Sequence, residues 1–428
     1  MEHMKNYRDL TPEEMKQELA QLRHVYDQVK AEKLELNMAR GKPAADQLDL
    51  SMPMLNDLNT LDDLISEDGT DCRNYGTLDG IIEAKKLIAD LMEVKPENVF
   101  VGGNASLQLM YIMVANAWCF GIDGCQPWCR QGTVKFLCPV PGYDRHFRIT
   151  EVFGIQLVNI PMHEDGPDMD LVEQYVNNDP TVKGIWCVPK YSNPDGYSYS
   201  DETVRRFAAL KPAAKDFRIF WDNAYFFHHL DFDHPDVILN IMDECQKAGS
   251  PDLVYEFMST SKMALPGASI SAVITSPHNM DQLKHQISAQ IISFDKVNQM
   301  RQVKFFKDPQ HLAEHMKKHA ALLLPKFQTV WDAFKELGDL GIARWTTPRG
   351  GYFISLYTLP GCAKRTVQLC KEAGVTLTGA GAAFPYGIDP EDSHIRIAPS
   401  YPSLDDLKKA CRVVVLSVKI ASLEKLIG

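Results

Sequence analysis

A lysine at the end of a predicted buried strand is the strongest candidate for chemistry in this sequence. Lys262 follows the apolar run Leu253–Met258 and a short cluster of hydroxyl side chains. Most lysines are solvated surface groups, but burial at the mouth of a strand lowers the pKa of the amine and frees a neutral nitrogen to attack a carbonyl. Pro266 and Gly267 would bend the chain beside it. We therefore expect Lys262 to act as a nucleophile and base.

An aspartate also ends an apolar run. Asp222 follows Arg218–Trp221, and Tyr225 comes three residues later. The simplest alternative is an aspartate that caps a helix after a strand. A carboxylate at this place could instead keep the ring nitrogen of an aromatic cofactor protonated, so that the ring accepts electrons. Tyr225 could then reach an oxygen on the same ring.

Two further segments follow apolar runs. Asn193 lies in Asn-Pro-Asp-Gly, a turn signal that structure alone explains, although its amide could donate to the same ring oxygen. Tyr143 and His146 follow the run Val134–Val140. An aromatic ring here could stack on a cofactor, and His146 could support Asp222 from behind. The alternative for His146 is an ordinary surface or core histidine.

Anion-binding groups are suggested at two other places. Ala105 and Ser106 follow Gly102-Gly103-Asn104 and open an apolar helical run, and free amides at such a helix start hold phosphate. Arg396 interrupts an apolar strand, and a buried arginine needs an anionic partner that a substrate carboxylate would supply. The segment 379–384 has two of the glycines of a dinucleotide fingerprint but lacks the third, and no suitable strand precedes it.

The elements that must position these residues form an alternating pattern. Helical periodicity alternates with short apolar runs between about residues 80 and 280, which predicts an α/β domain with a mainly parallel sheet. Such sheets bind ligands at the carboxyl ends of their strands. The remaining runs are Val99–Val101, Ile155–Ile160, Gly184–Val188 and Ile270–Ile274.

Helical patterns and an α+β tail flank this region. Thr11, Pro12 and Glu14 predict a capped helix with an apolar stripe. A long helical pattern covers residues 311–337, and Ser403 can cap a last helix.

Composition excludes several classes of protein. The chain has 428 residues with 45 Lys+Arg and 56 Asp+Glu, a net charge of −11, which disfavours nucleic acid and anionic membranes as partners. No apolar stretch is long enough to span a membrane, and the polar N-terminus does not resemble a signal peptide. The ten cysteines include Cys125 and Cys129, whose spacing matches neither a redox pair nor a zinc site. We expect reduced thiols, no metal and a cytoplasmic location.

Taken together and in this order, the segments resemble the class I aminotransferases, which are fold type I enzymes dependent on pyridoxal 5'-phosphate. The likeness covers Arg40 to Arg396. In detail, several short segments resemble a divergent bacterial branch of aspartate aminotransferases grouped with MocR-type proteins. The segments that resemble this branch are Ala39–Pro43, Asp295–Gln299, Pro348–Phe353 and Thr376–Gly381.

The resemblance implies a role for each candidate residue, with Lys262, Asp222 and Tyr143 as the catalytic group. On the cofactor ring, it assigns Lys262 to the Schiff base, Asp222 to the ring nitrogen with His146 behind it, Tyr143 to ring stacking, and Asn193 and Tyr225 to the ring oxygen. It assigns Ala105, Ser106 and Ser259 to the cofactor phosphate. On the substrate side, it assigns Arg396 to the α-carboxylate and places Gly41 and Asn193 next to the substrate.

The resemblance also implies a domain arrangement and a homodimer. Residues 48–308 would form the large cofactor-binding domain, and residues 1–47 and 309–428 a small domain built from both chain ends. Tyr75 matches a tyrosine that reaches the phosphate of the neighbouring subunit, so that isologous contacts would complete each site.

One departure concerns the phosphate. The family usually has an arginine after Pro266-Gly267, but here Ser269 occupies the expected position. Another cation, a helix end or hydroxyls must balance the phosphate, and Lys296 of a partner chain is one candidate.

Aspartate with 2-oxoglutarate is the expected substrate pair, on family likeness alone. Transamination of another amino acid, and β-lyase or decarboxylase chemistry with the same cofactor, remain alternatives. A regulator that senses the cofactor is a further one, but too few residues precede the first family segment for a DNA-binding domain. The distal carboxylate of aspartate needs a second cation, for which the candidates are Arg40, Lys42, Lys296 and Arg301.

Overall fold

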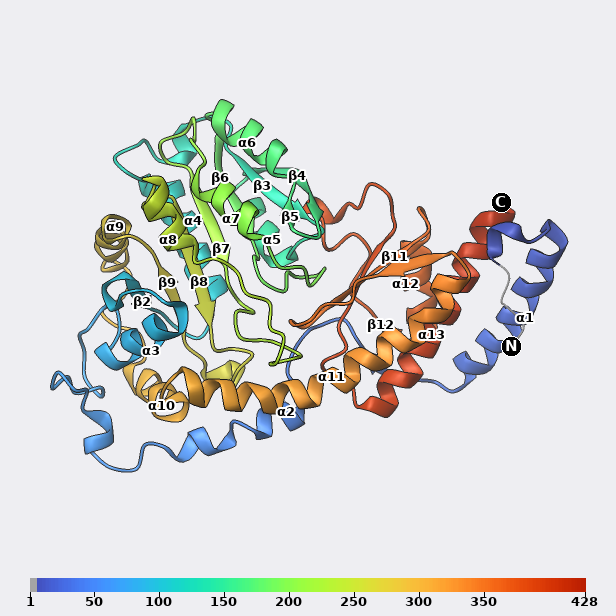
Figure 1. Ribbon diagram of the computed structural model, residues 1–428, viewed down its shortest axis with the longest axis horizontal. Coiled ribbons are helices and arrows are strands. Elements are labelled where there is room, and N and C mark those ends of the chain that lie inside the picture. Colours follow the sequence, from blue (N-terminus) through green and yellow to red (C-terminus); the bar gives the residue numbers. More distant parts are fainter. Residues whose placement is uncertain (1–5) are drawn as a thin grey trace.

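The computed structural model describes residues 6–428 and consists of two lobes joined by one long helix. The larger lobe contains the central sheet, and the smaller lobe contains both ends of the described chain (Figure 1). The long helix, α11 (Pro309–Asp339), runs along one side of both lobes. A long helix here was predicted from its periodicity, and it is confirmed.

The large lobe is built on an eight-stranded sheet in the order β2-β9-β8-β7-β6-β3-β4-β5. The inner pairs β8–β7, β7–β6, β6–β3 and β3–β4 are parallel, and the outer pairs are antiparallel. The predicted α/β class with a mainly parallel sheet is therefore confirmed. The strands are β2 (Val99–Val101), β3 (Lys135–Val140), β4 (Gln156–His163), β5 (Gly166–Pro167), β6 (Val182–Cys187), β7 (Arg218–Asp222), β8 (Val254–Ser259) and β9 (Ser271–Ile274).

Alternate side chains of the inner strands supply two different cores. Phe136, Trp186 and Phe220 pack against one set of helices, whereas Ile219 and Trp221 pack against the other. Because both faces are covered, the inner strands are apolar almost throughout. The first set is α4 (Ser106–Phe120), α5 (Asp144–Val152) and α9 (Pro277–Ile287), and the second is α6 (Met169–Asn178), α7 (Asp201–Ala208) and α8 (Ile241–Ala248).

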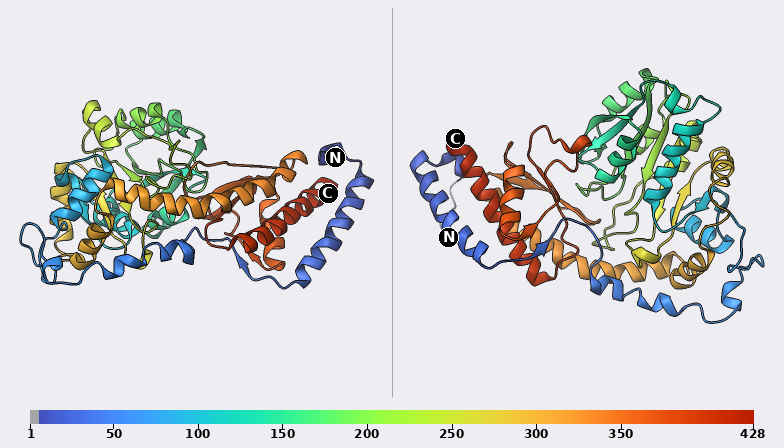
Figure 2. Two further views of the ribbon diagram at one scale, coloured as in Figure 1. Left: turned by 60° about the horizontal axis from the view of Figure 1, so that its bottom comes forward. Right: turned by 180° about the vertical axis from the view of Figure 1, so that it is seen from behind.

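The small lobe combines segments from the two ends of the described chain. Its three-stranded antiparallel sheet has the order β10-β11-β13, and β1 near the N-terminus pairs in parallel with β12. Helix α1 lies against α13 in both views of Figure 2. The elements are α1 (Pro12–Ala31), β1 (Leu36–Asn37), β10 (Ala343–Trp345), β11 (Ile354–Thr358), α12 (Ala363–Glu372), β12 (Val375–Thr376), β13 (His394–Ile397) and α13 (Leu404–Ile427).

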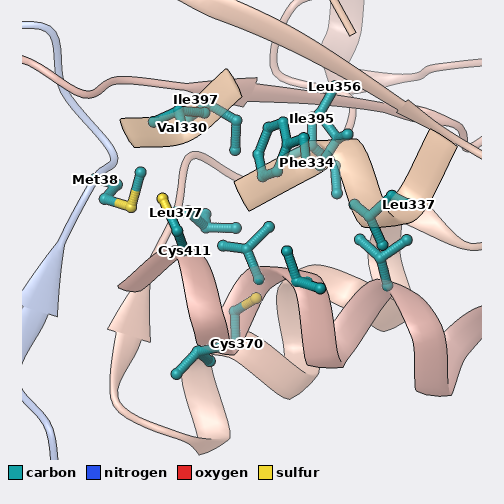
Figure 3. Close-up of a cluster of buried hydrophobic side chains, with 14 of the residues drawn as sticks. Met38, Val330, Phe334, Leu337, Leu356, Cys370, Leu377, Ile395, Ile397 and Cys411 are labelled. Carbon is teal, nitrogen blue, oxygen red and sulfur yellow. The ribbon is translucent and has the colours of Figure 1, made fainter. Parts of the chain in front are cut away.

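The core of the small lobe draws on all of these segments. In Figure 3, Met38 of the N-terminal segment lies close to Leu377 and Cys411, while Phe334 of α11 lies among Ile395 and Leu356. Burial of apolar side chains at about 25 cal/mol per Å² is the main force that holds such a lobe together.

The capped start of α1 matches the sequence pattern. The Thr11 Oγ1 accepts from the Glu14 amide at 3.3 Å, and the Thr11 amide donates to the Glu14 carboxylate at 2.6 Å. Met15, Leu22 and Val29 on the apolar stripe are buried. The predicted capping box is confirmed, and so is the cap of α13 by Ser403.

Helix α11 belongs to two cores. Leu312 and Met316 pack in the large lobe with α3 (Ile82–Met92) and α10 (Lys296–Phe306), whereas Phe327 and Val330 pack in the small lobe. Pro325 lies inside the helix, just after Leu323, the first residue of α11 that packs in the small-lobe core. Helix α11 begins at Pro309 and packs in both lobes, so it does not mark a clean division between them. The domain boundary expected near residue 308 stays a prediction.

Two expectations drawn from composition can be compared with the structure. All ten cysteines are free thiols, including Cys125 and Cys129. In the part of the chain that is described, no helix is long and apolar enough to cross a membrane, and no cluster of three or more His, Cys, Asp or Glu side chains could hold a metal ion.

Candidate active site

A cavity of about 250 Å³ opens at the carboxyl ends of β6, β7 and β8. This is the edge at which parallel α/β sheets bind ligands. Most of the predicted residues meet here, although they lie between Ala105 and Lys262 on several different elements. The cavity is lined by Ala105, Ser106, Leu107, Met110, Tyr143, Val188, Asn193, Asp222, Ala224, Tyr225, Ser259, Ser261 and Lys262.

Asp222 forms the buried end of the cavity. Its Oδ2 accepts a hydrogen bond of 2.9 Å from Nε2 of His146, a residue of α5. The imidazole stacks on Trp186 with 4.7 Å between ring centroids and 16° between planes, which fixes its orientation. The other oxygen, Oδ1, is buried and has no hydrogen-bond partner. A buried carboxylate oxygen without a partner is costly, so this atom is prepared for a donor that a ligand brings.

Lys262 approaches the cavity from the turn that follows β8. Amides of Met263 and Ala264 both donate to the Thr260 carbonyl, at 2.9 and 3.0 Å, and this closes the turn directly after the lysine. The half-buried Lys262 Nζ lies 4.9 Å from the centroid of the Tyr225 ring. The amine therefore lies over an aromatic face, inside the same cavity as Asp222.

Tyr225 and Tyr143 stay protonated in this site. Burial raises the pKa of both phenols. The negative charge of Asp222 adds to this effect at Tyr225, whereas at Tyr143 the positive charge of Lys262 partly opposes it. A protonated phenol can donate a hydrogen bond, so either hydroxyl can serve a developing negative charge on a ligand. Asn193, the third predicted donor, also lines the cavity.

Another part of the cavity lining is rich in hydroxyls and backbone amides. Ala105 is the N-cap of α4 and makes no side-chain cap, which leaves the helix start open toward the cavity. Ser259 Oγ lies 2.5 Å from Ser261 Oγ, which lies 2.9 Å from Ser269 Oγ. Helix amides and hydroxyls together favour an anion here.

Ser261 is a residue that sequence reasoning missed. The hydroxyl side chains of residues 259–261 are visible in the sequence, but Ser261 lies in the turn after β8, where strand alternation does not predict which way its side chain faces. Thr260 between them turns away and donates to Gln302 at 2.9 Å.

The position expected for a phosphate-binding arginine is filled by a buried hydroxyl. Ser269 Oγ donates to the Asn104 carbonyl at 2.5 Å and contacts Ser261. Among the described residues that line the cavity, Lys262 is the one cation.

Lys296 is engaged within its own chain. Its buried Nζ donates to the carbonyls of Asn74 and Gly76, at 2.6 and 2.9 Å. These carbonyls flank Tyr75, whose side chain is 81% exposed and lies outside the cavity lining of its own chain. The lysine thus holds the Tyr75 loop, which makes it a poor candidate for reaching a phosphate in a partner.

Arg396 lies on β13 beside the cavity, with its side chain 8% exposed. Nη1 donates to Asp144 Oδ1 at 3.0 Å and to Asn193 Oδ1 at 3.4 Å, while Nε is buried without a partner. The guanidinium lies 4.9 Å from the Phe353 ring centroid. Asp144 was not singled out from the sequence, because a helix-opening aspartate carries no local sign of a partner 252 residues away.

Gly41 packs on the same aromatic ring. A Cβ built at this position would lie 2.5 Å from Cζ of Phe353, so only glycine fits without moving the ring. The structure therefore places the Gly41 loop next to the ring that supports Arg396.

The four candidates for a second substrate cation lie outside the cavity lining. Arg40 and Lys42 are exposed, and Lys42 Nζ lies 3.8 Å from the Tyr401 ring centroid. Arg301 donates to Asn298 Oδ1 at 3.3 Å and borders a separate cavity next to Ser269. Lys296 is engaged as described above.

Asp144 competes with any carboxylate that binds Arg396, which leads to a first prediction. We expect Asp144→Asn to lower KM for an acidic substrate by about 2–5-fold, because a partly exposed ion pair is worth roughly 0.5–1 kcal/mol, and to leave kcat nearly unchanged. Steady-state kinetics measures both. Asp201→Asn is the matched control, since Asp201 also opens a helix and lies 3.6 Å from an arginine. A higher KM in Asp144→Asn would instead show that Asp144 orients the arginine.

Known proteins share this architecture over nearly the whole chain. The fold and the site together define an aminotransferase of fold type I, the class of the pyridoxal-phosphate-dependent transferases. The chain belongs to the aspartate amino-transferase family, whose model matches residues 10–428.

Two curated relatives and one solved structure are similar over almost their full length. A putative aminotransferase of Mycolicibacterium smegmatis is 45% identical over 94% of this chain and 95% of its own. An aspartate aminotransferase of Corynebacterium glutamicum is 44% identical over 94% of this chain and 93% of its own. The crystal structure of an aspartate transaminase from C. glutamicum superposes with a TM-score of 0.95 at 41% identity, covering 98% of this chain and 99% of that one. The likeness to the branch grouped with MocR-type proteins stays a prediction.

Proposed function

We propose that this aminotransferase binds pyridoxal 5'-phosphate at Lys262 and transfers the amino group of L-aspartate to 2-oxoglutarate. The observation that carries the cofactor assignment is the unpartnered Oδ1 of Asp222 in the cavity that also holds the Lys262 amine. A protonated ring nitrogen would satisfy this oxygen. The substrate assignment is supported by the full-length relative called an aspartate aminotransferase.

The residues of the cavity fit the cofactor from end to end. Asp222 would take the ring nitrogen, with His146 holding the carboxylate in place. Tyr225 and Asn193 would donate to the ring oxygen, and Tyr143 would cover the ring face. The open start of α4 with Ser106, Ser259 and Ser261 would hold the phosphate, so that amides and hydroxyls replace the usual arginine.

When bound, the cofactor supplies an aldehyde that condenses with amines and a ring that stabilises a carbanion at the substrate Cα. Lys262 supplies the amine that first holds this aldehyde. Lys262 Nζ would remove the substrate Cα proton as a general base and return it as a general acid. Asp222 keeps a positive charge on the ring nitrogen during this transfer.

Arg396 would orient the substrate through its α-carboxylate. A charge-assisted hydrogen bond of this type contributes about 1.5–3 kcal/mol. Nε of Arg396 is buried and has no partner, whereas Nη1 would become available to the carboxylate once its bond to Asp144 opens. Phe353 and the Gly41 loop would close this side of the site.

A homodimer in the cytoplasm completes the proposal. Tyr75 is exposed on a loop held by Lys296, where a partner's cavity could receive its hydroxyl. Free thiols throughout the chain fit a reducing compartment.

The test is a half-reaction with aspartate as the sole substrate. We expect the visible absorption band of the bound cofactor to be replaced by the band of its aminated form, with one oxaloacetate released per site. Adding 2-oxoglutarate should restore the first band and release glutamate. Alanine at equal concentration is the control for the distal carboxylate. Continuous consumption of aspartate without an acceptor would show a lyase or decarboxylase, and an unchanged band would remove aspartate as the donor.

A further inference from the structure

A buried chain of hydrogen bonds connects α11 and the N-terminal segment to the backbone at Lys262. His315 Nε2 lies 2.7 Å from the Met263 carbonyl oxygen, and His319 Nε2 lies 3.1 Å from His315 Nε2. Gln47, in α2 (Ala45–Asp49), donates from Nε2 to His319 Nδ1 at 3.2 Å and to the Tyr352 hydroxyl at 3.0 Å. Tyr352 in turn donates to the carbonyl of Lys262 at 3.4 Å.

The partners in this network fix its protons. The Ala44 amide donates to Gln47 Oε1 at 3.2 Å, so the Gln47 amino group must face His319 and Tyr352. His319 Nδ1 is therefore an acceptor, and its proton is on Nε2. His315 must also carry its proton on Nε2, because that atom faces a carbonyl oxygen. Both Nε2–H groups thus share the Met263 carbonyl as acceptor, and the 3.1 Å between the two Nε2 atoms is a contact between two donors and not a hydrogen bond.

Both imidazoles are neutral in this arrangement. Burial lowers the pKa of His319 to about 3 and also lowers the pKa of His315. Gln47 is fully buried, and Tyr352 and His319 are each 1% exposed. The protons of Gln47 and Tyr352 each face an acceptor, and His315 and His319 share the Met263 carbonyl, so the contacts favour one arrangement of the network.

We propose that Gln47, His315, His319 and Tyr352 are positioning residues that aim the Lys262 amine by holding the carbonyl oxygens of Lys262 and Met263. This inference rests on Lys262 as the residue that holds the cofactor. The two carbonyls belong to Lys262 itself and to the residue after it, in the turn that follows β8, so holding them restrains the direction of the lysine Cα–Cβ bond.

The location of the four residues gives the network a second consequence. Gln47 lies six residues after Gly41 and close to the loop that covers the site, whereas His315 and His319 lie on the helix shared by both lobes. The backbone at Lys262 is thereby tied to the segment that follows Gly41 and to the helix shared by both lobes. An apolar core of the same shape would avoid the desolvation cost of this network but could not hold the carbonyls.

Tyr352→Phe tests the proposal, because it removes one hydroxyl and leaves the ring. Tyr26→Phe is the matched control, since the buried Tyr26 hydroxyl donates to the Leu369 carbonyl at 2.7 Å far from the site. We would measure the rate at which each apoprotein captures pyridoxal 5'-phosphate, the pH midpoint of the visible spectrum, kcat, KM and the melting temperature. Gln47→Met removes both amide donors and serves as the second variant.

We expect Tyr352→Phe and Gln47→Met to slow cofactor capture and to lower kcat by about 3–10-fold each, as for the loss of one or two hydrogen bonds. The spectral midpoint should shift, and KM should stay within about twofold. Tyr26→Phe should lose about as much thermal stability as Tyr352→Phe, and its capture rate, spectral midpoint, kcat and KM should equal those of the wild type. Capture rates, spectra and kcat equal to wild type in the folded variants would overturn the proposal.

The premise is tested separately on the wild-type protein. Borohydride reduction followed by peptide mapping should locate the cofactor on Lys262. If the label lies elsewhere or is absent, the proposed cofactor lysine fails before any variant is compared. If the label is on Lys262 and the variants match wild type, the positioning proposal alone fails. Should Tyr352→Phe not fold, Gln47→Met decides the outcome, and Gln47→Glu, which keeps the contact to the Ala44 amide, replaces it if needed.

Discussion

Replacing Lys262 by alanine is expected to lower kcat by about 10⁴-fold or more. General base catalysis alone contributes about 10²–10⁴-fold, and this residue also supplies the amine that holds the cofactor. The cavity offers no substitute, because Lys262 is the one cation among the described lining residues. Steady-state turnover of aspartate with 2-oxoglutarate measures the loss, and single-turnover kinetics locates it in the proton transfer.

Two control variants separate chemistry from folding. Lys262→Arg keeps the positive charge but cannot form the covalent bond, so it should be nearly as inactive as alanine. Lys190→Met removes another buried lysine that follows a strand, whose Nζ donates to the Phe226 carbonyl at 2.9 Å. This variant should lose stability and keep most of its kcat. Substantial turnover by Lys262→Ala would exclude the proposed mechanism.

Asp222→Asn should lower kcat by about 10²–10³-fold, the usual effect of removing one electrostatic group that stabilises a transition state. Oδ2 is held by His146, so an asparagine would keep its oxygen there and turn its amino group toward the ring nitrogen. A donor would then face a donor, and the ring would lose its proton. The absorption spectrum of the bound cofactor reports this change independently of turnover.

Asp216→Asn is the matched control for a lost buried charge. Asp216 is 2% exposed and pairs with Lys183 at 2.7 Å, outside the active-site cavity. The Asp216→Asn variant should unfold at a lower temperature than the wild type, and its kcat per folded molecule should be unchanged. If Asp222→Asn were as active as Asp216→Asn, the carboxylate would have no role in the chemistry.

Much of the sheet and part of the site could be predicted from the sequence for a single physical reason. Strands covered on both faces are apolar throughout, so the runs ending near Trp221 and Met258 stand out, and the polar residue after each one lies at the ligand-binding edge. Asp222 and Lys262 were found in this way, and the structure brings them into one cavity.

Other parts of the site depend on contacts without a local pattern. Gln47 reaches His319 across 272 positions, and Arg396 reaches Asp144 across 252. Nothing near either residue in the chain indicates such a partner. The engagement of Lys296 with the Tyr75 loop was likewise invisible, because a lysine in a helical pattern is usually solvated.

The long helix α11 sets how the lobes can move. A helix whose first half belongs to one core and whose second half belongs to the other cannot slide or detach without breaking both. Any change in the angle between the lobes must therefore be absorbed as bending within the helix. Pro325 lacks the amide proton that would complete the backbone ladder at this level, so bending costs least there. We therefore expect any tilt of the small lobe over the cavity to bend α11 near Pro325 and not to slide one lobe past the other.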